Sequence, residues 1–534
     1  MGPGSKYWFL KTLFSVLLLS VDHFSRAQLS QPARYEKEQR SGDDRFTVIS
    51  MNENGLALIR NKNKFLEGKS YAEIILLDSD LQETWATEVA LHNQLHLIGY
   101  EFVHDDLYFL YRKGENDRGG LHLLQLNITH HDVTPHEIEP QLAFTLSHFT
   151  VAGHSVVLGG YVNAQPTVYL YDMDTRRSKI VPGLLVPNTE LLDLRINQNN
   201  SFNVVLMERS THEKKQLILK TFDDSGEPIV DESFDIDGNK TILSGISSTL
   251  KREELLLAGT WGQANSKMAT GIYSAVVDPF NRHVIQFYDF SELNHFFDYL
   301  SPRKAAKIKS RARRRKDEGK LPQHRAYLNV CKLEENDDGF VLLSEIYSPA
   351  SNSSPYATGY PTYPYSYPPY STGGGYYPSN TYNPYYYNPY GNYGTRYSRT
   401  DVTVHNSSVV VFDSQGRIKE DASCKFSETM HLPSLDQVSD FNYTDKKIVQ
   451  VYKGEMGIRV SVSQDDGGPP ARSTEKIQLK SPDEILRNES FAYGVVRHWF
   501  DSYLFVWGYE TIKEKKQPGS PARHVFYVNK LNSE

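Results

Sequence analysis

The sequence predicts an all-β protein, a β-propeller of seven or eight four-stranded blades with one inserted basic helix and one disordered tyrosine-rich loop. The first observation is the stretch SSVVVFDSQGRIK at 407–419, where a β-branched apolar run stops at an Asp/Ser/Gly turn and then resumes. This pattern is typical of two antiparallel strands joined by a tight hairpin. The second observation is that weaker copies, such as AEIILLDSDLQET and TVYLYDMDTRRS, recur along the chain.

The spacing of these copies predicts the blades. We expect such strands near residues 74, 123, 169, 218, 275, 410, 459 and 527, and the first four are 49, 46 and 49 residues apart. Periods of about 40–50 residues are typical of propeller blades. The last repeat lacks a fourth strand, so either the N-terminal segment closes the ring or the true count is seven. Two stacked β-sandwich domains are the alternative architecture.

Residues 1–27 have the layout of a cleavable secretory signal. Lys6 and Lys11 precede an apolar run at 13–21, and Ser25 and Ala27 occupy the −3 and −1 positions. We therefore expect a secreted protein, periplasmic or extracellular, with an uncleaved anchor as the alternative. No later stretch approaches the ~20 apolar residues of a membrane span, so we expect no transmembrane segment in the mature chain. Residues 28–44 are polar and are expected to be flexible, and the propeller is expected to occupy 45–534.

The first insertion, residues 289–324, interrupts the repeat between the fifth and sixth units. Ser301 and Pro302 suit the N-cap and first position of a helix, and the 18 residues 303–320 hold ten Lys or Arg against two acidic residues. We expect a basic helix that the apolar stretch LNHFFDYL at 293–300 packs onto the blade edge. A solvated helix that offsets an acidic body is the alternative. The candidate binding residues on this helix are Arg303, Lys304, Lys307, Arg311, Arg314 and Arg315.

The second insertion, residues 348–405, falls between the second and third strands of the sixth unit. Its core at 356–397 contains 15 of the 35 tyrosines, with many Pro, Gly, Ser and Asn residues and no apolar periodicity. Such a composition predicts a disordered, partly extended loop. Its phenolic rings could adhere to sugars or aromatic surfaces, whereas a tolerated surface loop is the alternative. The candidate binding residues here are Tyr376, Tyr377, Tyr385, Tyr386 and Tyr387.

The two insertions are expected on one face of the propeller, on neighbouring blades. In a four-stranded blade, the connection to the next blade and the loop between the second and third strands emerge on the same side. The segments FFDYLSPRKAAKIK and FVLLSEIYSP, together with the signal and the β-repeats, resemble a family of uncharacterised secreted bacterial propeller-like proteins. That resemblance implies the fold and export but no activity.

Composition restricts the chemistry. With 65 acidic and 58 basic residues the net charge is −7, which argues against general nucleic-acid binding, and we expect no specific nucleic acid as a partner. Cys331 and Cys424 are expected on the innermost and outermost strands of one unit, three spacings of ~4.8 Å apart. A disulfide needs Cα atoms within ~7 Å, so free thiols are expected. The sequence contains no HExxH motif, phosphate-binding loop or dinucleotide fingerprint, and we predict no cofactor, no metal site and no catalytic residue.

These features lead to one functional hypothesis and two alternatives. We expect an exported, non-catalytic binding or scaffold protein that uses the face with both insertions, and a protein or a surface polysaccharide as its partner. One alternative is a secreted propeller enzyme that acts on a polysaccharide through the central channel. The other alternative is a purely structural envelope protein, because fold alone does not decide function.

Overall fold

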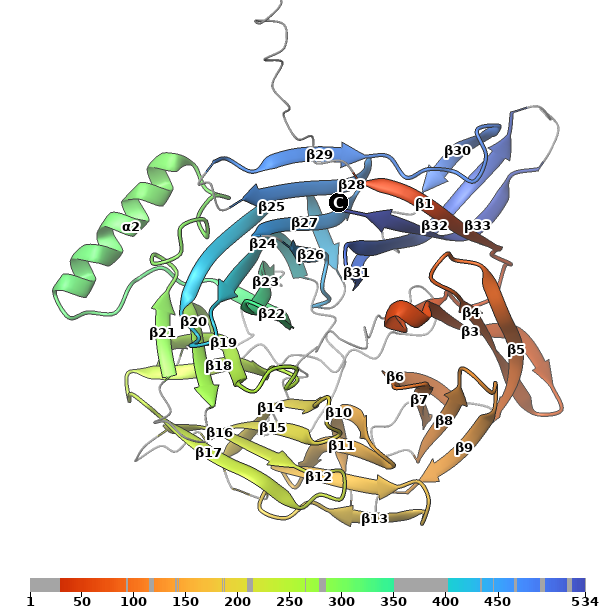
Figure 1. Ribbon diagram of the computed structural model, residues 1–534, viewed down its shortest axis with the longest axis horizontal. Coiled ribbons are helices and arrows are strands. Elements are labelled where there is room, and N and C mark those ends of the chain that lie inside the picture. Colours follow the sequence, from red (N-terminus) through yellow and green to blue (C-terminus); the bar gives the residue numbers. More distant parts are fainter. Residues whose placement is uncertain are drawn as a thin grey trace, which may run out of the picture.

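The computed structural model is an eight-bladed β-propeller, with antiparallel sheets arranged around a central axis (Figure 1). The part of the chain that the structure describes forms seven four-stranded sheets and one five-stranded sheet. The fold class and the count of eight are therefore confirmed, whereas a seven-bladed ring and stacked sandwiches are excluded. The structure describes residues 29–533 except 93–94, 115–119, 140–141, 143, 185, 187, 209–214, 265, 278–284, 350–401, 433–434, 445, 465–467, 490–494 and 516–520.

In blades 1 to 7 each strand pairs with the next strand along the chain. The first strand of each blade lies nearest the axis and the fourth lies at the rim (Figure 1). The strands of blades 1 to 4 are β2 (Thr47–Ser50), β3 (Leu56–Leu66), β4 (Lys69–Leu77), β5 (Glu83–His92); β6 (Leu95–Val103), β7 (Asp106–Lys113), β8 (Leu121–Asn127), β9 (Val133–Ile138); β10 (Thr145–Ala152), β11 (Ser155–Val162), β12 (Gln165–Asp172), β13 (Arg177–Ile180); β14 (Thr189–Ile196), β15 (Phe202–Glu208), β16 (Lys215–Phe222) and β17 (Pro228–Ile236).

Blades 5 to 7 follow the same plan, whereas in blade 8 two strands pair with the same side of a third strand and the N-terminal strand of the chain pairs with the last one. A short 3-10 helix, η1 (Asn52–Asn54), connects the first two strands of blade 1. The strands of blades 5 to 8 are β18 (Lys240–Ser247), β19 (Leu255–Gln263), β20 (Ala269–Val277), β21 (Ile285–Asp289); β22 (Tyr327–Asn336), β23 (Gly339–Pro349), β24 (Val402–Phe412), β25 (Ile418–Leu432); β26 (Ser439–Thr444), β27 (Lys447–Gly454), β28 (Gly457–Gln464), β29 (Ala471–Glu475); β30 (Glu484–Glu489), β31 (Val496–Phe500), β32 (Tyr503–Glu514), β33 (Arg523–Asn532) and the N-terminal β1 (Ser30–Glu38).

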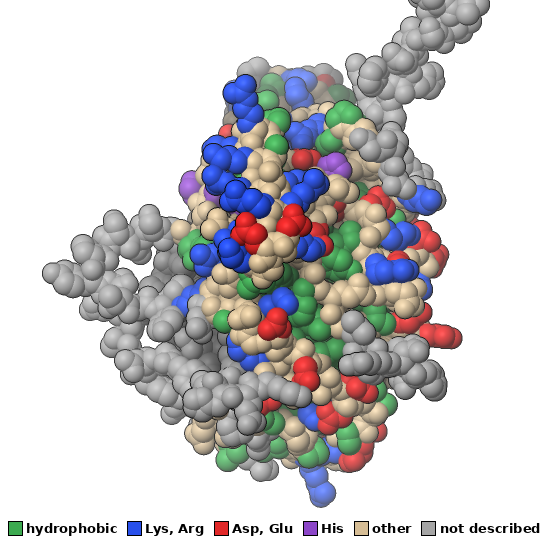
Figure 2. Space-filling view, turned by 90° about the vertical axis from the view of Figure 1, so that its left-hand side faces the viewer, with side chains coloured by type: hydrophobic (Ala, Val, Ile, Leu, Met, Phe, Trp, Pro, Cys, Tyr) green, Lys and Arg blue, Asp and Glu red, His purple; other side chains and the backbone are tan. Residues whose placement is uncertain are grey.

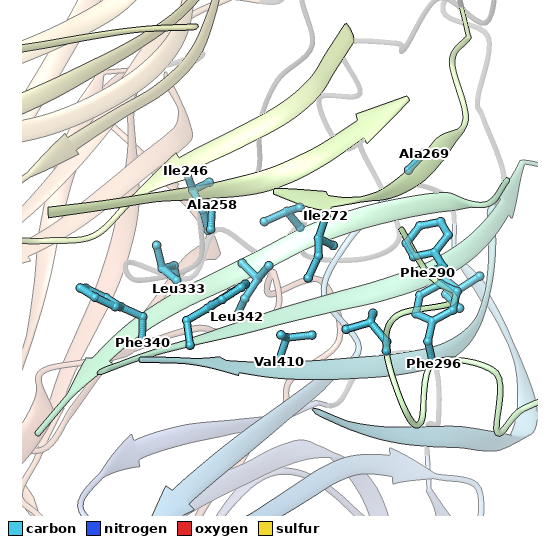
Figure 3. Packing of buried hydrophobic residues seen from close by; sticks show 14 of the residues in the cluster. Ile246, Ala258, Ala269, Ile272, Phe290, Phe296, Leu333, Phe340, Leu342 and Val410 are labelled. Atoms are coloured by element: carbon cyan, nitrogen blue, oxygen red, sulfur yellow. The ribbon is translucent and has the colours of Figure 1, made fainter. Parts of the chain in front are cut away.

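The hydrophobic core lies between neighbouring blades. The middle strands of each sheet are apolar on both faces, as β19 shows with a fully buried LLLAGTWG run. Figure 3 shows one such interface, in which Ile246 and Ala258 of blade 5 face Leu333 and Leu342 of blade 6. Sheets that are covered on both sides need apolar residues at successive positions, which explains why the apolar runs in the sequence are continuous rather than alternating.

The N-terminal segment closes the ring. Strand β1 is the outermost strand of the eighth sheet and pairs antiparallel with β33, with Arg34 opposite Asn529 and Tyr35 opposite Val528. The alternative in which the N-terminal segment completes the last repeat and closes the ring is therefore confirmed. The expectation that residues 28–44 are flexible is wrong for residues 30–38, because the free edge of β33 offers backbone groups that this strand satisfies.

The basic segment forms the predicted helix, α2 (Pro302–Asp317), at the rim of the ring between β21 and β22 (Figure 1). Ser301 is the N-cap by backbone conformation, although its side chain makes no capping hydrogen bond, and Pro302 begins the helix. The second insertion is shorter than expected, because β23 continues to Pro349 and β24 begins at Val402, where these two residues pair. The tyrosine-rich segment lies outside the described residues.

The two cysteines are free, as predicted, and both are buried. Cys331 lies on β22 and Cys424 on β25, the first and fourth strands of blade 6. Burial raises the pKa of the Cys424 thiol to about 11. No helix among the described residues is long and apolar enough to span a membrane.

Candidate functional site

Of the predicted binding residues on α2, five lie on its outward side. The side chains of Arg303, Lys304, Lys307, Arg311 and Arg314 are exposed. Figure 2 views the side of the molecule that carries α2, and on this face Lys and Arg side chains gather in one area with a few acidic side chains beside them.

Arg315, the sixth candidate binding residue on the helix, differs from these five. It is half-buried, and its Nε donates a hydrogen bond to the carbonyl of Leu321 at 2.7 Å. The predicted Tyr376, Tyr377, Tyr385, Tyr386 and Tyr387 lie outside the described residues.

Apolar contacts hold α2 against the rim. Ala312 is buried, and Ala305 and Ile308, on the same side of the helix, pack against the core between blades 5 and 6. In the preceding loop, the Phe290 and Phe296 rings stack with centroids 4.0 Å apart (Figure 3). The helix is therefore a fixed part of the propeller, as the apolar stretch before it predicts.

A buried carboxylate fastens the loop that leads into α2. Asp421 of β25 accepts hydrogen bonds from the backbone N–H groups of Asn294 and His295, at 2.8 and 2.7 Å. Burial raises the pKa of Asp421, although these hydrogen bonds oppose the change. On the helix itself, the Lys309 ammonium donates to the carbonyl of Asn294 at 2.8 Å. Blade 6 therefore determines the position of a segment that belongs to the connection from blade 5.

A second candidate site is a cavity of about 1100 Å³ at the centre of the ring. Its walls come mainly from the innermost strands, especially from the ends where these strands turn into the second strand of each blade. Because neighbouring blades are related by rotation about the axis, these ends meet on one face. Helix α2 precedes the start of β22 and therefore leaves the ring at the other face.

Ionisable side chains from most blades line this cavity. Its cationic side chains, among the described residues, are Arg112, Arg195, Lys251, Arg252 and Lys332. Its carboxyl groups are Glu53, Glu101, Glu334, Glu335, Asp337 and Asp501. The enzyme alternative requires a channel of this kind, lined by the innermost strands and not filled by apolar side chains. The central cavity meets this requirement.

Blades 2 to 4 form one wall, where burial keeps two groups uncharged. Burial raises the pKa of the Glu101 carboxyl to about 8, with Arg195 of β14 opposing part of the effect. Among the described residues, Glu101 makes no ion pair and no hydrogen bond. Burial also lowers the pKa of His148 to about 3, and its Nδ1 lies 2.7 Å from the Ser147 hydroxyl. At neutral pH this wall therefore presents a carboxylic acid and a neutral imidazole.

The opposite wall, formed by blades 6 to 8, carries an ionic network. The Lys332 ammonium contacts the Glu334 carboxylate and lies 3.3 Å from that of Asp440. The His498 Nδ1 lies 3.4 Å from Glu334, and its backbone N–H donates to Asp440 at 2.9 Å. Burial opposes the charge on Glu334, yet Lys332 and His498 together lower its pKa. Burial by itself would lower the pKa of His498, but the attraction and the hydrogen bond of the Glu334 carboxylate together outweigh burial and raise this pKa.

Glu335 connects blade 5 to this wall. Its carboxylate accepts hydrogen bonds from the backbone N–H of Thr249, from the Thr249 hydroxyl at 3.0 Å and from the backbone N–H of Arg252 at 3.0 Å. Adjacent residues of β22 alternate in direction, so Glu334 faces the ionic network while Glu335 holds the loop of the neighbouring blade. No group of three or more His, Cys, Asp or Glu side chains suited to a metal ion occurs within the described ranges.

Sequence reasoning did not identify the cavity residues individually. The signal available was a charged cluster at the end of a first strand, as in CKLEENDD at 331–338. Similar charged residues also occur at ordinary hairpin turns on the surface. Only the arrangement of the blades in a ring distinguishes a turn that lines the cavity from one that faces solvent.

In comparisons with known proteins, the chain is similar to solved structures but not to protein families or curated sequences. Neither a protein-family model nor a curated protein sequence matches the chain. The polysaccharide lyase Uly1 aligns with 9% identity and a TM-score of 0.38, over 94% of this chain and 100% of the lyase. The propeller domain of the Trilobed protease from Pyrococcus furiosus aligns with 9% identity and a TM-score of 0.32, over 83% and 96%. The dihydro-heme d1 dehydrogenase NirN aligns with 12% identity and a TM-score of 0.37, over 95% and 79%. Similarities at this level carry no argument about activity.

Proposed function

We propose that the protein is an exported, non-catalytic binding protein that docks an acidic polysaccharide of the cell surface on the outward side of α2. The observation that carries this proposal is that a firmly anchored helix presents five exposed cationic side chains together. A fixed helix loses little conformational freedom when a ligand binds, so its charges act on the ligand at a low entropic cost. Polyanions are attracted to such a surface by long-range forces that salt weakens.

Export is the second part of the proposal, and the charge pattern of residues 1–27 supports it. The resemblance to secreted bacterial propeller-like proteins points the same way. Expression of the full chain in a secreting bacterial host, followed by N-terminal sequencing, tests this part. A mature protein that begins at Gln28 would agree with it, whereas a cytosolic protein that retains Met1 would contradict it.

Binding of immobilised alginate, with neutral dextran as the reference polymer, tests the docking surface. A variant in which Arg303, Lys304, Lys307, Arg311 and Arg314 are all changed to Gln should bind alginate about tenfold more weakly or worse, without a change in Tm. The matched control changes five exposed cations of other blades to Gln: Lys69, Arg177, Lys446, Lys476 and Arg487.

The control should keep most of the alginate binding, and high salt should weaken the binding of the wild type. Equal losses in both variants would mean that net charge, and not α2, determines binding. Binding to an acidic protein but not to alginate would refute the polysaccharide and leave a protein partner.

The propeller enzyme is the second candidate function, because the central cavity meets its structural requirement. Incubation of the protein with neutral and acidic polysaccharides, followed by measurement of new reducing ends, tests it. An enzyme would be supported if the wild type produced new reducing ends and substitution of Glu101 or Glu334 abolished them.

A further inference from the structure

The central cavity has the size and position of a ligand site. Its volume of about 1100 Å³ is slightly above the ~300–1000 Å³ typical of small-molecule pockets. It lies on the axis, on the opposite face from α2, so it is a separate site from the docking surface proposed above.

The charge of the cavity wall does not favour strongly charged ligands. Five cationic side chains and six carboxyl groups line it, and the carboxyl group of Glu101 is protonated at neutral pH because burial raises its pKa to about 8. The wall then carries five negative charges against five Lys and Arg charges, and the His498 imidazolium, which Glu334 favours, adds to the positive side. A wall with charges this close to balance attracts neither a polyanion nor a polycation strongly, because its long-range field nearly cancels.

The same wall is rich in both hydrogen-bond donors and acceptors. Guanidinium and ammonium groups only donate, carboxylates only accept, and a protonated carboxyl such as that of Glu101 does both. Two half-buried aromatic rings, Phe149 of blade 3 and Phe500 of blade 8, also line the cavity. A hydroxyl group both donates and accepts, so a ligand with many hydroxyls can hydrogen-bond to both kinds of group on this wall, and its C–H faces can pack on the rings.

We propose that the central cavity binds a short, uncharged oligosaccharide whose hydroxyl groups bridge the cationic and carboxyl side chains of the wall. Blade 2 lies across the ring from blade 6 (Figure 1), so Glu101 contacts one side of the sugar and Lys332 and Glu334 contact the other. This site does not depend on the α2 surface.

An array of oligosaccharides tests the inference. The array holds neutral gluco-, manno-, xylo- and galacto-oligosaccharides of two to six units, with oligogalacturonates and chitosan oligomers as charged counterparts. The whole mature protein should bind at least one neutral series and bind it more tightly than either charged series. Absence of neutral binding, or preference for a charged series, would overturn the proposal.

Two variants then place the bound sugar in the cavity. Glu101→Leu removes the hydrogen-bonding carboxyl at nearly constant volume, and Thr444→Trp adds a large ring at an exposed position of the cavity wall. Each should weaken the binding of the selected oligosaccharide by about tenfold or more. The control Arg177→Gln, on the rim strand β13, should bind as the wild type does. Unchanged affinity in both cavity variants, with Tm values showing that they fold, would overturn the proposal.

Discussion

Arg34 of β1 joins the two ends of the chain through a buried ionic contact. Its Nη2 lies 2.7 Å from the carboxylate of Glu510 on β32, and its Nε lies 2.7 Å from that of Glu36. The Arg34 side chain is 7% exposed and that of Glu510 is fully buried. The guanidinium also lies over the Tyr527 ring, 4.6 Å from its centroid.

We predict that Arg34→Met destabilises the propeller by about 3–5 kcal/mol. Methionine retains much of the apolar contact with Tyr527, but the change leaves the carboxylate of Glu510 buried without its ion-pair partner. Removing one member of a buried ion pair costs this much because a desolvated charge stays behind. The control Arg40→Met, at an exposed position, should change the stability by no more than about 0.5 kcal/mol.

Urea unfolding of the wild type, both single variants and the double variant Arg34→Met/Glu510→Leu measures the effect. The double variant should be more stable than the sum of the single changes predicts, by about 1–3 kcal/mol, since Leu removes the stranded charge. Hydrogen exchange of residues 30–38 should show that β1 opens first in Arg34→Met. A loss below about 1 kcal/mol, or strict additivity, would refute a role for this ion pair in ring closure.

Three further predictions follow from the buried groups. Folding raises the pKa of the Glu101 carboxyl from 4.5 to about 8. The contribution of this carboxyl to the free energy of unfolding should therefore be highest at low pH and should fall as the pH rises from about 4.5 to 8. Glu101→Gln should therefore raise the free energy of unfolding relative to the wild type at pH 8, by on the order of 3 kcal/mol, and have little effect at pH 4; equal pH profiles of the two proteins in urea unfolding would contradict this. Asp421→Ala should cost about 1–3 kcal/mol and expose residues 290–320 to limited proteolysis, because two backbone N–H groups lose their acceptor; an unchanged digestion pattern would count against the anchoring role. Cys331 and Cys424 should react with a thiol reagent only after unfolding, with two thiols titrated in urea and none in the native protein; early labelling or a missing thiol would be inconsistent with two buried free cysteines.

Local sequence was sufficient for the repeating unit. The third strands expected near residues 74 and 410 correspond to β4 and β24, because apolar β-branched runs that end at Asp/Gly turns favour hairpins whatever surrounds them. Helix α2 was equally predictable from Ser301, Pro302 and the composition that follows. The free cysteines also followed from strand order, since residues on the first and fourth strands of one sheet are too far apart to bond.

The candidate site depends on contacts between residues that are distant in sequence. Strand β1 looks like a polar tail until the edge of β33, almost 500 residues later, supplies its partner. The loop before α2 is likewise held by Asp421, whose carboxylate lies more than 120 residues further along the chain than the Asn294 and His295 N–H groups from which it accepts hydrogen bonds.

The cavity shows most clearly what only the tertiary structure decided. Glu101 and Glu334 are both glutamates near the end of a first strand, and the sequence gives no reason to assign them different protonation states. Burial without a close partner keeps Glu101 protonated, whereas Lys332 and His498 keep Glu334 ionised. Short-range patterning thus determined the strands, the helix and the turns, but closure of the ring determined which charges meet, because desolvation and ion pairing depend on distances in space.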